Sequence, residues 1–196
     1  MSQRNYLTTD EVQRLLDSAK QGLNPERNRC MVAMCYLHGF RISELLKLRL
    51  SDIDLPTRTL NIHRLKNGFS TIHPMIPCEV SLLELWLNTR QNWASLDDDS
   101  LFISRNGKPL SRQQGYNIIN ALGKRAGLPL CSHPHMLRHA CGFAMADNGI
   151  DTRLIQDYLG HRNIRHTVRY TASNAARFEG IWKEKNMRRN KLLVLS

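Results

Sequence analysis

Apolar residues recur at three- and four-residue intervals along most of the chain, a pattern that predicts amphipathic helices. Thr8 with Glu11 forms the capping box of a first helix that runs to about residue 20. Asn24-Pro25 opens a second helix, which Gly39 ends. Further helices are expected at 41–48, 77–92, 111–125 (capped by Ser111 and Gln114), 132–149, 151–160 and 165–170, with a last one after Ser173.

Two runs rich in β-branched residues, 59–65 and 69–75, flank Lys66-Asn67-Gly68. An Asn-Gly pair between two such runs is a strong hairpin signal. Residues 54–56 are expected to form a turn, and 101–104 a short strand or extended piece. The predicted fold class is therefore mainly α with a small antiparallel β-sheet or hairpin.

The length and composition fit one soluble domain. The 196 residues are 41% hydrophobic and 23% charged, and no run reaches the apolar length of a transmembrane helix or a signal peptide. The five cysteines show no CxxC pair and no zinc-like spacing, which favours a reducing compartment without disulfides. A cytoplasmic protein is expected.

The charge points to a polyanionic partner. Net charge is +11 with a pI near 9.9, and residues 161–196 carry nine lysines and arginines against two glutamates. A basic tail is often only a solubilising surface, so charge alone leaves nucleic-acid binding open and says nothing of catalysis.

Several residues near the predicted turns are candidates for a phosphate site. Arg41 follows a glycine turn, and Glu44, three residues on, can orient its guanidinium. Lys66 stands at the hairpin tip. A solvated arginine and a solubilising lysine remain equally simple interpretations of this pair.

The segment HPHMLRHACG places His135 and Arg138 on nearly the same face of one helix. His133, His135 and His139 are possible metal ligands, but no acidic residue lies nearby, so a phosphate-binding pair is favoured and no metal is expected.

Two tyrosines compete as a nucleophile. Tyr158, in IQDYLG, has the apolar spacing of a packing residue, whereas Tyr170 follows Arg162, Arg165 and Arg169 in a cationic stretch. Tyr170 is therefore preferred, although a core tyrosine remains the simpler alternative for either residue.

Taken together, the motifs resemble those of the tyrosine recombinase (phage integrase) family. GFRISELLKL is similar to its first arginine box, HPHMLRHACG to its second, and LGHRNIRHTVRYT to its nucleophile box, over residues 6–180. The resemblance implies the tyrosine recombinase catalytic-domain fold at 1–180, followed by a basic tail at 181–196. The catalytic set it implies is Arg41, Lys66, His135, Arg138, His161 and Tyr170, with Glu44 in support.

That set suits phosphodiester cleavage through a 3′-phosphotyrosine intermediate. Arginine forks stabilise charge on the phosphate oxygens, and the resemblance implies a further contact from His161. A tyrosine with an ordinary pKa near 10 needs a proton acceptor, for which His135 is suited. Lys66 is the proton donor that the family implies for the leaving 5′ hydroxyl. Neither metal nor ATP is required, because the phosphotyrosine bond conserves the energy of the ester.

The strings RLKNGFSTIHP, SRQQ and DTRLIQDYLGHRNIRHTVRYTASNAARF are similar to the fimbrial phase-variation DNA invertases of enteric bacteria. This resemblance implies inversion of a promoter-bearing element, with a homotetramer on two inverted-repeat sites in double-stranded DNA. Accessory DNA-bending proteins and a nucleoid location are part of the same expectation. The first arginine box at position 41 leaves no room for the separate N-terminal domain of most relatives.

The DNA contacts are less defined than the catalytic set. Candidate contacts are Arg105, Lys108, Arg112, Arg162 and Arg165. Alternatives to inversion are integration or excision of a mobile element, relaxation of supercoils by a type IB topoisomerase-like enzyme, and a non-catalytic DNA-binding regulator on the same fold.

Overall fold

The computed structural model describes residues 4–64, 70–95 and 98–172. Its helices are α1 (Thr9–Lys20), α2 (Pro25–Leu37), α3 (Ile42–Leu45), α4 (Pro77–Arg90), α5 (Arg112–Arg125), α6 (Pro134–Asp147), α7 (Thr152–Leu159) and α8 (Arg165–Ala172). A short 3-10 helix, η1 (Leu50–Asp52), precedes the strands β1 (Ile53–Asp54), β2 (Thr59–Ile62) and β3 (Thr71–Pro74). The mainly helical class with a small antiparallel sheet is confirmed.

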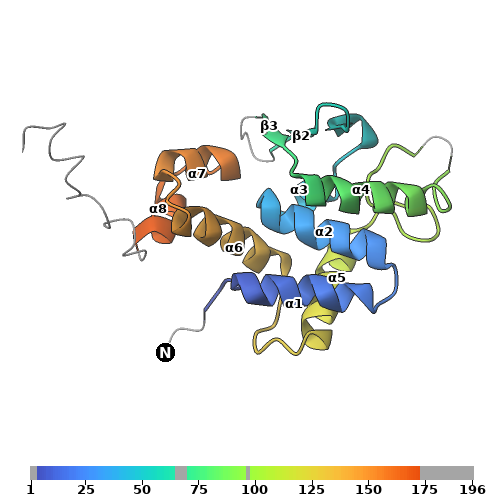
Figure 1. The fold of residues 1–196 in the computed structure, drawn as a ribbon, viewed down its shortest axis with the longest axis horizontal. Coiled ribbons are helices and arrows are strands. Elements are labelled where there is room, and N and C mark those ends of the chain that lie inside the picture. The colour runs from blue at the N-terminus through green and yellow to red at the C-terminus, as the bar shows by residue number, and fades with distance from the viewer. Residues whose placement is uncertain (1–3, 65–69, 96–97, 173–196) are drawn as a thin grey trace, which may run out of the picture.

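Helix α2 is the centre of the fold, because it packs against α1, α4 and α6 (Figure 1). Residues 30–35 of α2 are all buried, including Met31, Val32 and Met34. Trp86 of α4 is fully buried as well, and its indole N–H donates to the carbonyl of Leu101 at 3.0 Å. The apolar run that predicted this helix therefore lies at the centre of the main hydrophobic core.

Helix α6 joins this core to a second, smaller one. Cys141 on α6, Ile155 and Leu159 on α7, and Tyr170 on α8 form a separate cluster of buried residues. Figure 1 shows α7 and α8 gathered around the end of α6, away from α4 and α5. Tyr170, the nucleophile that the sequence favoured, thus lies in the smaller hydrophobic cluster rather than in the central core.

The antiparallel sheet has the order β1-β2-β3, with Leu60 opposite His73 and Asp54 opposite Thr59. The prediction of a turn at 54–56 was wrong for Asp54, because a two-residue strand is too short to show alternation. The Asn67-Gly68 turn lies outside the described residues.

Two other expected elements are shorter than predicted. The helix expected at 41–48 is regular only over Ile42–Leu45, since Leu46 and Lys47 already turn toward the buried Leu48. The expected strand at 101–104 makes only an isolated bridge between Ile103 and Pro109. No described helix has the length and apolarity needed to cross a bilayer.

The first helix gives a stability test of the capping box. Thr8 Oγ1 accepts from the Glu11 N–H at 3.3 Å, and the Glu11 carboxylate accepts from the Thr8 N–H at 2.8 Å. We expect Thr8→Ala to lower the free energy of unfolding by about 1 kcal/mol, measured by urea denaturation. The exposed neighbour Thr9 is the control, and a Thr9→Ala effect as large as that of Thr8→Ala would contradict the prediction.

Candidate active site

Five of the predicted catalytic residues surround one open pocket of about 550 Å³. Arg41 comes from the turn before α3, His135 and Arg138 from α6, His161 from the loop after α7, and Tyr170 from α8. The pocket is also lined by Gly160, Arg162, Asn163, His166, Arg169 and His139. The fold therefore brings residues 129 positions apart in sequence to a single cationic site, and Lys66 lies outside the described residues.

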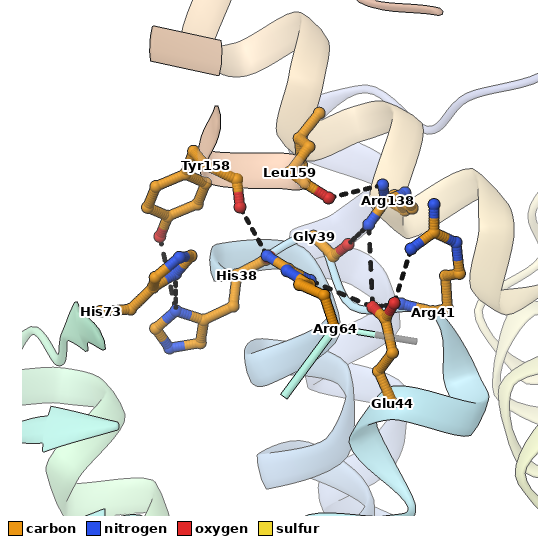
Figure 2. A network of polar contacts seen from close by, with 9 residues as sticks. All are labelled: His38, Gly39, Arg41, Glu44, Arg64, His73, Arg138, Tyr158 and Leu159. Atoms are coloured by element: carbon orange, nitrogen blue, oxygen red, sulfur yellow. Dashed lines mark hydrogen bonds and ion pairs between the residues drawn. The ribbon is translucent and has the colours of Figure 1, made fainter. Parts of the chain in front are cut away.

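The carboxylate of Glu44 lies at the base of this site, in contact with three arginines (Figure 2). Arg41 Nη1 donates to Oε1 at 2.5 Å and Arg64 Nη1 donates to Oε2 at 3.0 Å. Arg138 Nη1 is 3.9 Å from Oε2. Burial alone would raise the pKa of Glu44, but the Arg41 N–H and the Arg64 and Arg41 charges outweigh it and lower the pKa. Glu44 is an anion that the arginines keep ionised.

Arg138 is fixed by backbone carbonyls as well as by charge. Nη1 donates to the carbonyl of Gly39, and Nη2 donates to that of Leu159 at 2.7 Å. Gly39 has φ +58, which glycine adopts without strain, and this turn aims its carbonyl at α6. Burial lowers the pKa of Arg138 to about 10, with help from Arg41 and Arg64, so the guanidinium stays charged at neutral pH.

Tyr170 is only 1% exposed although it lines the pocket. Its hydroxyl is hydrogen-bonded to His139 Nδ1 at 2.8 Å. The ring rests on Gly142, where a Cβ would come within 2.5 Å of it, and on the edge of Phe143. Burial raises the pKa of Tyr170, against the lowering effect of the Arg169 and Arg138 charges. The phenol is therefore neutral and buried in the wall of the pocket.

Two histidines of the site, His139 and His161, are neutral bases rather than cations. Burial, followed by Arg169, lowers the pKa of His139 to about 3, and burial with Arg138 and Arg41 lowers that of His161 to about 3. His161 Nδ1 is 2.9 Å from the hydroxyl of Thr167, which is fully buried. That contact fixes the ring and leaves Nε2 as its other polar atom.

His135 lies at the exposed rim of the pocket and meets His139 edge to face, with ring centroids 4.9 Å apart. Its pKa is lowered by partial burial and by Arg138. The sequence pointed to His135 as the proton acceptor of Tyr170, whereas the hydroxyl contacts His139 in this structure. The sequence signal for His139 was its position four residues after His135 and three before Gly142, which places all three on one face of α6.

Sequence reasoning assigned no role to Arg64, whose side chain is fully buried against Glu44. Arg169 also gains significance, because its guanidinium lies against the His139 ring, 2.7 Å from Nδ1, and over the Tyr170 ring at 5.4 Å. Tyr158, the rejected nucleophile, packs as expected: its hydroxyl donates to the carbonyl of Leu37 at 2.9 Å.

The expected DNA contacts lie in two places. Arg162 lines the pocket and Arg165 is exposed at the start of α8. Arg105 bonds Asn24 at 2.8 Å beside a second hollow, and Lys108 and Arg112 are exposed near it. Among the described residues, no group of three or more histidine, cysteine or acidic side chains is arranged to hold a metal ion.

The buried histidines make stability depend on pH. His73, His139 and His161 each have a pKa of about 3 in the fold, against 6.5 in the unfolded chain. Their contribution is present above about pH 6.5 and is lost as the pH falls toward 3, because only the unfolded chain takes up the protons.

We expect the melting temperature to fall between pH 8 and pH 5. His73→Gln should flatten this slope, and a slope equal to that of the wild-type protein would contradict the assignment.

Sequence comparison finds two fimbrial regulatory proteins and a tyrosine recombinase among the relatives of this chain. Type 1 fimbriae regulatory protein FimB of Escherichia coli strain K12 is 58% identical over 179 residues, covering 91% of this chain and 90% of that protein. FimE of the same strain is 55% identical over 193 residues, 98% of each chain. Tyrosine recombinase XerD of Oceanobacillus iheyensis is 31% identical over 182 residues, 91% of this chain and 61% of that protein.

Solved structures agree with this assignment. XerA recombinase superposes with a TM-score of 0.79 at 29% identity, covering 99% of this chain and 67% of its own. XerH recombinase bound to its difH substrate gives 0.74 at 26% identity, covering 86% of this chain and 50% of its own. The phage integrase family profile matches residues 5–177. The resemblance inferred from the three motif boxes is confirmed: this chain belongs to the phage integrase family and is a tyrosine-type site-specific recombinase.

Proposed function

We propose that this recombinase inverts a promoter-bearing DNA element and so switches fimbrial expression, with Tyr170 as the nucleophile. The observation that carries the chemistry is the convergence of Arg41, Arg138, His161 and Tyr170 on one pocket. The observation that favours fimbrial switching is identity of 58% and 55% to two type 1 fimbriae regulatory proteins, over nearly the whole chain.

In the proposed reaction the Tyr170 oxygen attacks the scissile phosphorus and the P–O5′ bond breaks, which leaves a 3′-phosphotyrosine. Arg41 and Arg138 stabilise the charge on the non-bridging oxygens. Both terminal nitrogens of Arg138 already donate to carbonyls, but each carries a second N–H for the phosphate. His161 adds a neutral donor through Nε2, because Thr167 holds its other nitrogen.

The phenol proton needs an acceptor, and two neutral imidazoles are close. His139 contacts the hydroxyl in the free protein, and His135 stands on the pocket side of His139. Because Tyr170 is buried, it must leave His139 and lean into the pocket before it can attack. At that stage His135 accepts the phenol proton, as the sequence indicated. Lys66 donates a proton to the leaving 5′ oxygen.

The DNA substrate is double-stranded with inverted-repeat sites, bound by a homotetramer and assisted by accessory DNA-bending proteins, in the cytoplasm at the nucleoid. Two similar structures were solved on DNA, XerH with difH and the Tn1549 transposon integrase with transposon-end DNA. We assign DNA contacts close to the scissile phosphate to Arg162 and Arg165. We assign contacts with the adjoining part of the duplex to Arg105, Lys108 and Arg112. Residues 1–180 form the catalytic domain, and 181–196 a basic tail.

A nicked suicide substrate tests the nucleophile, because loss of the short cleaved fragment traps the covalent adduct. We expect wild-type protein and Tyr158→Phe to form the adduct and Tyr170→Phe to form none, as seen on denaturing gels. Tyr158→Phe is a matched control, since it removes a phenol hydroxyl that bonds only protein groups. An adduct with Tyr170→Phe would overturn the assignment.

Removal of metals tests the proposed independence from cofactors. We expect the adduct to form at an unchanged rate in EDTA, because the arginines supply the positive charge that a metal would otherwise contribute. Loss of the adduct in EDTA and its return with zinc would contradict this chemistry.

A plasmid assay distinguishes inversion from integration. With two inverted repeats flanking a reporter promoter, we expect inversion, read as a changed restriction pattern. Exchange only between separate molecules would favour a mobile-element integrase instead.

A further inference from the structure

Arg64 is a buried cation directly beneath the pocket. It follows strand β2, and its side chain is inaccessible to solvent. It does not line the pocket, but its aliphatic carbons pack on Gly160, which does: a Cβ at Gly160 would lie 3.0 Å from Arg64 Cγ. Because its side chain is buried, Arg64 cannot touch DNA in this arrangement, although it packs against the pocket wall at Gly160.

The guanidinium of Arg64 joins three elements of the site (Figure 2). Nη1 donates to Glu44 Oε2 at 3.0 Å, and Nη2 donates to the carbonyls of Tyr158, at 2.5 Å, and His38, at 3.3 Å. The residues after Tyr158 and His38, namely Leu159 and Gly39, are the ones whose carbonyls hold Arg138. One arginine thus supports both carbonyl anchors of another.

The charges around Glu44 explain why an arginine is needed there. Arg41, Arg64 and Arg138 surround a single carboxylate, so the group carries a net charge of +2. Without Arg64 the net charge falls to +1, and Glu44 competes with the phosphate for Arg41 and Arg138. A buried charge that loses one partner is costly, because it is left without full compensation. The remaining neighbours of Glu44, Arg41 and Arg138, are then drawn more strongly to it.

We propose that Arg64 is a positioning residue for DNA cleavage, which neutralises Glu44 and so leaves Arg41 and Arg138 available to the scissile phosphate. This inference rests on the proposed function. It predicts a defect that depends on the charge of the phosphate, which a loss of packing would not produce.

The test compares two suicide substrates that differ only at the scissile position: a phosphodiester and a methylphosphonate, which is neutral. We expect Arg64→Met to slow adduct formation on the phosphodiester about 10- to 100-fold, which is less than the roughly 10²–10³-fold loss for a direct contact, because Arg64 acts through Glu44. On the methylphosphonate the loss, relative to wild type, should be at least several-fold smaller. Arg64→Lys should recover much of the phosphodiester rate, because it restores the charge without the fork.

Arg90→Met is the matched control. Arg90 is equally buried and also donates to backbone carbonyls, those of Asp98 and Ser100, with the Asp98 carboxylate at 3.7 Å, but it lies on α4 outside the pocket. We expect it to lower the melting temperature as Arg64→Met does, without changing the ratio of the two substrate rates.

Equal losses on both substrates would make Arg64 a purely structural residue and overturn the inference. Absence of any adduct with the wild-type protein would overturn the proposed function instead. If Arg64→Met does not fold, Arg64→Gln takes its place, since its amide is a polar hydrogen-bond donor without charge. The same shift toward the methylphosphonate is then expected, and an unchanged ratio would again overturn the inference.

Discussion

The buried Glu44 carboxylate is the interaction on which the rest of the site depends. A carboxylate without solvent contact is costly unless it is fully paired, and here three arginines from separate parts of the chain pair it. Those arginines repel one another, so Glu44 is also what allows them to approach. The outcome is a group with excess positive charge whose geometry is fixed before DNA arrives, as electrostatic catalysis of phosphoryl transfer requires.

The second constraint is the position of Tyr170, the proposed nucleophile. Tyr170 belongs to a small hydrophobic cluster, and its hydroxyl rests on His139 rather than in open solvent. Burial keeps the phenol protonated and the neighbouring imidazoles neutral. The arginines Arg41 and Arg138 thus line the pocket, while the Tyr170 hydroxyl is hydrogen-bonded to His139. Among the described residues, the main contacts of α8 are with α6 and α7, so the position of Tyr170 is set by these two helices.

Much of the helical framework could be predicted because its signals are local. The Thr8 and Ser111 capping boxes, the Asn24-Pro25 start and the glycine at 160 mark helix ends through the hydrogen bonds of single turns. Strand β1 and the shortened α3 were not predictable in the same way. Two residues cannot show an alternating pattern, and α3 ends at Leu45 although the apolar spacing continues to Leu48, which is buried outside the helix.

The sequence by itself determined the family and the helical class and led to a proposed catalytic set, because the motif boxes keep reactive residues in short, distinctive strings. Only the tertiary structure decided which partners those residues have. Arg64 and Glu44 are 20 positions apart, and His139 and Tyr170 are 31 apart, so no local pattern links them. Pairing of buried charges and hydroxyls is settled by packing between distant elements. For this reason the site's supporting arginine and the resting partner of its tyrosine emerged only in three dimensions.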